Sequence, residues 1–107
     1  MEIGVGVAES VEYIAKRHNM VAVDISQVAL DKVSKIAKTY LTENMEDIPS
    51  ESIDLAFCNL VIQHCADDMV SFLIRQTLRT LKRDGIFSFQ SGYCMEKFES
   101  LELECFF

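Results

Sequence analysis

The sequence predicts an α/β fold in which helices cover a mostly parallel sheet of about five strands. Short apolar runs, typical of buried strands, alternate with segments whose apolar residues recur every three or four positions, as in amphipathic helices. The strand-like runs are apolar nearly throughout, as expected for parallel strands that are covered on both faces. No repeat or low-complexity linker interrupts the chain, so we interpret residues 1–107 as one domain.

The first half of the chain shows this alternation most clearly. The predicted elements are, in order, a strand stub over 1–3, a glycine loop, a helix over 9–17, a strand over 20–25, a helix that Ser26 caps and whose inner face runs from Ala29 to Tyr40, a brief strand over 39–42 and a loop over 43–52. Serine is a preferred residue at a helix N-cap, which supports the start of the second helix.

The second half repeats the strand and helix pattern. An apolar strand begins at residue 53 and is expected to end near Asn59. Asp67 or Asp68 can cap a helix that extends through Leu81 with Lys82 and Arg83 in its last turn, where cations meet the negative helix end. Gly85 would follow as a left-handed C-cap residue, and a strand is predicted over 86–91. The segment after residue 93 fits either a strand or a helix.

Composition and charge restrict the partners of the chain. The formal net charge is −7, which argues against nucleic acid and anionic membranes because both require clustered cations. Four cysteines lie at positions 58, 65, 94 and 105 without a CxxC spacing, so we expect no metal site and predict reduced thiols in a cytoplasmic protein. A small ligand that is held mostly by hydrogen bonds remains compatible with this charge.

The glycine loop and the acid after the second predicted strand suggest a binding site. Gly4 and Gly6 allow the backbone to turn tightly and to approach a ligand, and Asp24 could accept hydrogen bonds from a ribose diol. The alternative is a tight turn together with an aspartate that only caps the next helix. A dinucleotide fingerprint would need a small residue where Glu9 stands. The small residue is instead Ala8, which disfavours a nicotinamide-dependent oxidoreductase.

Five motifs in order carry a resemblance to a known family: EIGVGVA, VAVDIS, NMEDIP, IDLAFCNLVIQH and LKRDG. Over about residues 2–92 the chain resembles the class I S-adenosylmethionine-dependent methyltransferases of the small-molecule type. The resemblance implies a Rossmann-like three-layer sandwich. Members of that family have seven strands, so the chain is expected to be truncated at both ends relative to them.

The resemblance also implies cofactor-binding residues in the first half of the chain. Glu2, Gly4, Gly6 and Ala8 match the loop that wraps the methionine part of the cofactor, with Ala8 in place of a third glycine. An alanine there is expected to be tolerated if its φ is negative. Asp24 matches the acid that binds the ribose hydroxyls.

Further matches would surround the adenine ring and the methyl-transfer site. Ile25 matches a residue that packs on the adenine, and Asn44 and Met45 match the pair that binds the edge of that ring. Asn59 and Leu60 match residues beside the methionine amino group and the methyl-transfer site. Nearby, His64 could act as a general base or could be an ordinary surface or packed histidine.

The function that this resemblance implies is methyl transfer from S-adenosylmethionine to an unidentified small molecule, by in-line displacement at the sulfonium methyl. The alternative is a truncated or degenerate domain that binds the cofactor or a partner without catalytic activity. Because the sheet is expected to be incomplete, an exposed sheet edge would allow self-association.

Overall fold

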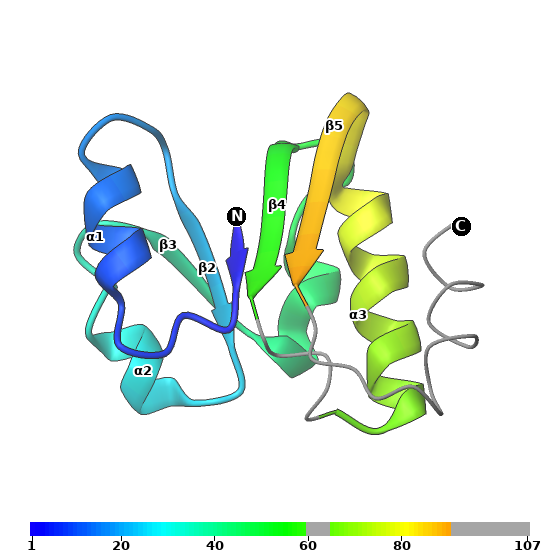
Figure 1. Cartoon of the computed structure of the whole chain (residues 1–107), viewed down its shortest axis with the longest axis horizontal. Helices are drawn as coiled ribbons and strands as arrows, with labels where there is room; N and C mark the ends of the chain where they lie inside the picture. Colours follow the sequence, from blue (N-terminus) through cyan, green and yellow to red (C-terminus); the bar gives the residue numbers. More distant parts are fainter. Residues whose placement is uncertain (60–64, 91–107) are drawn as a thin grey trace.

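The computed structural model describes residues 1–59 and 65–90, which form a sheet with flanking helices (Figure 1). The elements are, in order, β1 (Glu2–Ile3), α1 (Glu9–Ala15), β2 (Val21–Asp24), α2 (Gln27–Asp31), β3 (Lys38–Leu41), the 3-10 helix η1 (Thr42–Asp47), β4 (Ile53–Asn59), α3 (Asp67–Thr80) and β5 (Leu81–Gln90). Within these residues no helix is both long enough and apolar enough to cross a membrane.

The sheet has the strand order β3-β2-β1-β4-β5, and every pair of neighbouring strands is parallel. The predicted α/β class and the number of strands are therefore confirmed. β1 is a stub of two residues, yet it lies at the centre: Glu2 pairs with Ala22 of β2 and with Phe57 of β4. The strand order reverses at β1, because the chain first adds strands on one side of it and then on the other. Open parallel sheets bind ligands at such a reversal.

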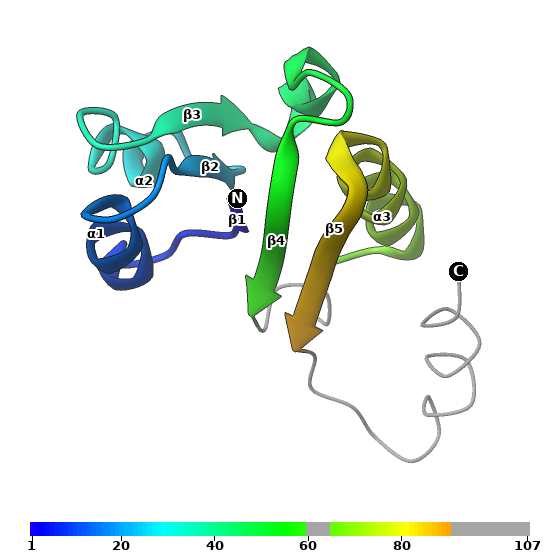
Figure 2. The same ribbon diagram turned by 90° about the horizontal axis from the view of Figure 1, so that it is seen from above.

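Two apolar cores lie on opposite faces of the sheet. Ala22 of β2 packs with Val11 of α1 and Leu30 of α2, whereas its neighbour Val23 packs with Leu73 of α3. Adjacent strand residues point to opposite faces, so one strand contributes to both cores. Figure 2 shows α1 and α2 beside β1–β3 and α3 beside β5. This arrangement is the predicted three-layer sandwich.

The helix that was predicted from Ser26 to Tyr40 is much shorter in the structure. Ser26 does cap it, since its Oγ accepts a hydrogen bond from the backbone N–H of Ala29 at 3.2 Å. The helix ends at Asp31, where the Ser34 hydroxyl donates to the carbonyl of Asp31 and the chain continues in turns. Tyr40 lies in β3 and pairs with Val23, so its predicted place on the helix is wrong.

The predicted end of the long helix is also wrong. The helix stops at Thr80, and residues 81–90 form β5, so neither Lys82 nor Arg83 lies in its last turn. The carbonyls of Arg79 and Thr80 accept hydrogen bonds from the backbone N–H groups of Glu51 and Ser52, which replaces the next helical turn with tertiary contacts.

The predicted caps at both ends of α3 are also wrong. Gly85 has no positive φ, but an added Cβ there would lie 2.9 Å from the carbonyl oxygen of Lys82, so it serves a close approach within β5 rather than a left-handed cap. The N-cap is Ala66, so the predicted capping by Asp67 or Asp68 is wrong. Both aspartates lie in the first turn, where the helix end favours negative charge.

The guanidinium of Arg79 connects α3 to the segment between β3 and β4. It donates to the Ser50 hydroxyl at 2.8 Å and to the Met45 carbonyl at 3.0 Å, and its Nε donates to Gln76 at 2.9 Å. These bonds fix η1 against the C-terminal end of α3. The end of β3 and the loop after it are therefore positioned by contacts that are distant in sequence.

Candidate functional site

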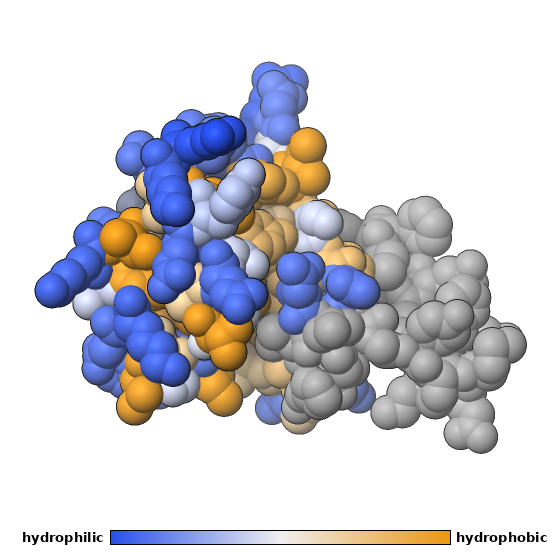
Figure 3. Space-filling model, turned by 60° about the vertical axis from the view of Figure 1, so that its left-hand side comes forward, coloured by the Kyte–Doolittle hydropathy of each residue, from blue (hydrophilic) through white to orange (hydrophobic). Residues whose placement is uncertain are grey.

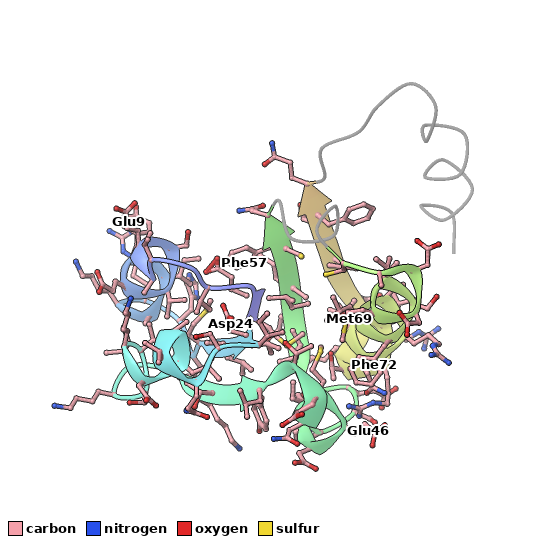
Figure 4. All side chains as sticks on the ribbon, turned by 90° about the horizontal axis from the view of Figure 1, so that it is seen from below. Glu9, Asp24, Glu46, Phe57, Met69 and Phe72 are labelled. Atoms are coloured by element: carbon pink, nitrogen blue, oxygen red, sulfur yellow. The ribbon has the colours of Figure 1, made fainter. Side chains whose placement is uncertain are left out.

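A cavity of about 380 Å³ opens at the carboxyl ends of the strands. It lies where the strand order reverses, beside the glycine loop that follows β1. Its lining comes from the β1 loop, the ends of β2, β3 and β4, and the start of α3: Ile3, Gly4, Gly6, Asp24, Ile25, Thr42, Asn59, Cys65, Met69 and Leu73. In Figure 4, Asp24 and Met69 lie on opposite sides of β4. The volume falls in the range of small-molecule sites.

The glycine loop has a left-handed residue at every second position. Gly4, Gly6 and Ala8 have φ values of 81°, 52° and 72°. The backbone N–H of Gly4 donates to the carbonyl of Val23 at 2.7 Å, which fastens the start of the loop to β2. The condition on which an alanine was expected to be tolerated at position 8, a negative φ, is therefore not met. The methyl group of Ala8 is buried at a backbone conformation that costs an L-residue about 1–2 kcal/mol.

Asp24 links the glycine loop to the end of β2. One carboxylate oxygen accepts a hydrogen bond from the backbone N–H of Val5 at 2.9 Å, and the other accepts from the backbone N–H of Ser26 at 2.9 Å. Each carboxylate oxygen can accept one further hydrogen bond. Asp24 therefore braces the loop and also presents acceptor positions to the cavity that it lines.

Glu2 is the most unusual ionisable group near the site. Its side chain is 4% exposed, and its Oε1 has no hydrogen-bond partner within the described part of the chain. Burial raises the pKa of Glu2 to about 7; the N-terminal ammonium lowers it and the charge of Asp24 raises it further. The cost of burying an unpaired carboxylate explains why the protonated form persists to neutral pH.

The structure brings together some of the predicted site residues and separates others. Five of them line the cavity: Gly4, Gly6, Asp24, Ile25 and Asn59. Four lie elsewhere: Glu2 in β1 and Met45 in η1 are buried, Ala8 is buried at the N-cap of α1, and Asn44 is exposed on η1. The predicted residues Leu60 and His64 lie outside the described residues, as does the C-terminal segment over 91–107.

Sequence reasoning missed half of the cavity wall. Thr42 follows β3, and Cys65, Met69 and Leu73 come from the beginning of α3 and the residues before it. The helix predicted over this segment is present, but its periodicity did not indicate that its first turns line a cavity. The signal that could have found Thr42 is its place directly after a strand of the parallel sheet, the same kind of signal that indicated Asp24.

Exposed apolar side chains lie on the cavity wall and on the neighbouring helix α2. The side chain of Ile25 is 80% exposed, and Val28, which lies one turn away at the start of α2, is 69% exposed. Figure 3 shows exposed apolar groups between charged ones on the side of the molecule that α1 and α2 form. An exposed isoleucine beside Asp24 provides a surface on which a flat ring can pack.

The family model of the methyltransferase domain matches residues 1–89. The chain belongs to the methyltransferase domain family. This confirms the family that the five motifs indicated. No curated protein matches the chain.

Two solved structures have the same fold as this methyltransferase domain. One is described as the S-adenosylmethionine-dependent methyltransferase from Mesorhizobium loti, with a TM-score of 0.69 and 19% identity over 86% of this chain. The other is a DhpI-SAM-HEP complex, with a TM-score of 0.68 and 15% identity over 97% of this chain. This chain covers 45% and 50% of them, so it spans about half of their length.

Proposed function

We propose that the cavity binds S-adenosylmethionine and that the chain directs transfer of its methyl group to a small-molecule acceptor. One observation carries the proposal: five cofactor residues that the family motifs indicate, from three separate strand ends, line a single cavity. Membership of the methyltransferase domain family supports the type of reaction. One of the two similar structures is an S-adenosylmethionine-dependent methyltransferase and the other is a complex with SAM, which supports the choice of cofactor.

The chemistry of the cavity fits this ligand. No lysine or arginine occurs among the described residues that line it, and Asp24 contributes a carboxylate. A phosphate-containing dinucleotide would find no cation to pair with, whereas a ligand with a sulfonium and an ammonium group would meet a favourable charge. Asp24 can accept from ribose hydroxyls, and Ile25 offers an apolar surface to the adenine.

The residues of the chain would act mainly by positioning. When bound, S-adenosylmethionine supplies a methyl group that its own sulfonium charge activates. Gly4 and Gly6 let the loop backbone approach the methionine part, Asp24 would hold the ribose, and Asn59 lies at the end of β4 facing the same cavity. In-line displacement requires alignment and exclusion of water more than an acid or a base. A role for His64 as general base stays a prediction.

Calorimetric titration with S-adenosylhomocysteine, the product form of the cofactor, tests the proposal. We expect saturable binding, and we expect it to be tighter than binding of NAD under the same conditions. Absence of binding at millimolar ligand would contradict the cofactor assignment, and tighter binding of NAD would contradict our interpretation of the loop. Binding without methyl transfer to any acceptor tested would favour the alternative, a cofactor-binding domain without activity.

We also propose that the methyl acceptor is a small molecule and that the chain self-associates. The charge of −7 favours a small molecule over nucleic acid or a membrane surface.

Within the described residues β5 has no partner strand on its outer side, and Ile86 is 62% exposed. Self-association through this edge stays a prediction, and sedimentation velocity over a range of concentrations would test it.

A further inference from the structure

The hydroxyl of Thr42 is a polar group with no role in the cofactor contacts proposed above. Thr42 directly follows β3 and is 4% exposed, yet it lines the cavity. Within the described part of the chain, none of the hydrogen bonds involves its hydroxyl. The other two buried threonines differ, because Thr77 and Thr80 donate to the helix carbonyls of Leu73 and Thr77.

The register of the sheet places Thr42 next to the residues that would hold the nucleoside. Asp24 pairs with Leu41, so Thr42 lies one residue beyond that level, in line with Ile25. If Asp24 holds the ribose and Ile25 packs on the base, the hydroxyl of Thr42 lies on the side of the cavity where the base enters. A hydroxyl oxygen can accept a hydrogen bond from an exocyclic amino group.

Asn44, the residue that the family motif assigns to the adenine, does not line the cavity. It is exposed on η1, while the neighbouring Met45 is buried in the core under α3 and its carbonyl accepts from Arg79 and from Ile48. These contacts hold η1 in an orientation that leaves Thr42 as the polar side chain of this segment in the cavity wall.

We propose that the hydroxyl of Thr42 accepts a hydrogen bond from the amino group of the adenine and so recognises the base. The inference rests on the proposed function, since it concerns the same cavity. Ile3, Ile25 and Leu73 contribute apolar side chains to the same cavity, and the proposed function assigns the carboxylate of Asp24 to the ribose rather than to the base. An amino group placed there without an acceptor would lose its hydrogen bonds to water and gain none in return. The hydroxyl of Thr42 would therefore decide whether the site prefers adenine to a base without the amino group.

The test is a cycle of two proteins and two ligands. Thr42→Val removes the hydroxyl and keeps the shape, and the second ligand is the 6-deamino (purine riboside) analogue of S-adenosylhomocysteine. The wild-type chain is expected to bind S-adenosylhomocysteine about three- to tenfold more tightly than the analogue, which is the usual range for one neutral hydrogen bond. In Thr42→Val this preference is expected to disappear, and in Thr42→Ser it is expected to persist.

Two further variants make the result specific. Thr39→Val carries the same change in β3 at a position outside the cavity wall and should leave both affinities unchanged. Equal weakening of both ligands by Thr42→Val would overturn the proposal, as would loss of the preference in Asn44→Ala but not in Thr42→Val. Absence of S-adenosylhomocysteine binding by the wild-type chain would instead refute the proposed function, and unfolding curves of each variant identify losses that arise from misfolding.

Discussion

Replacement of Asp24 by alanine is expected to weaken binding of S-adenosylhomocysteine by about ten- to hundredfold, or roughly 1.5–3 kcal/mol, the usual worth of a hydrogen bond to a charged group. The physical reason is that the carboxylate lines the cavity and has acceptor capacity left after its bonds to the backbone N–H groups of Val5 and Ser26. Calorimetry with purified folded variants measures the change directly.

The control must separate ligand binding from bracing of the loop, because the same substitution leaves the N–H of Val5 without its acceptor. Asp31→Ala is a matched change on α2, where the carboxylate accepts from the side chain of Gln27 and does not line the cavity, and it should leave the affinity unchanged. An analogue of the ligand without ribose hydroxyls should bind wild type and Asp24→Ala equally well. If Asp24→Ala folds and binds S-adenosylhomocysteine like wild type, Asp24 is only a structural brace.

Glu2 alone is expected to lower the free energy of unfolding by about 3 kcal/mol as the pH rises from 4.5 to above 7. Its pKa is about 7 in the folded chain against an ordinary value of 4.5. Between pH 4.5 and about 7 the folded chain keeps a proton that the unfolded chain has released. The contribution of Glu2 to stability is therefore fully present below the unfolded pKa of 4.5 and is lost as the pH rises through the folded pKa of about 7. Denaturant unfolding at several pH values measures this dependence.

The variant Glu2→Gln isolates this contribution, because a neutral amide cannot ionise. It should match the stability of wild type near pH 4.5 and exceed it by about 3 kcal/mol near pH 8. Glu12→Gln, an exposed change on α1, serves as the matched control and should follow wild type throughout. A difference between Glu2→Gln and wild type that stays constant with pH would show that Glu2 does not retain its proton in the folded chain.

The part of the site that was predicted from sequence lies at the ends of strands. Gly4, Asp24 and Asn59 each follow an apolar run, and the carboxyl ends of parallel strands meet at one edge of the sheet. Strand identity, which a local pattern reveals, was enough to bring Gly4 and Asp24 together, whereas Asn59 was indicated by the family resemblance. Thr42 has the same kind of position, since it directly follows β3.

The part that was missed depends on contacts that no local pattern contains. The apolar periodicity of α3 continues through Leu81, but pairing of Leu81 with Ile53 converts that residue into the start of β5. The left-handed φ of Ala8 follows from closure of the loop onto β2 and α1, not from the preference of alanine. Met69 reaches the cavity only because α3 packs against the sheet beside β5.

A single guanidinium ties the cavity to the far end of α3. Arg79 binds the carbonyl of Met45 and the hydroxyl of Ser50, and Met45 lies three residues after Thr42. Local opening of a protein tends to occur in cooperative units that share their hydrogen bonds. We expect the last turn of α3, η1 and the loop before β4 to open as one such unit. The rigidity of the wall that carries Thr42 would then depend on the last turn of α3, which does not itself line the cavity.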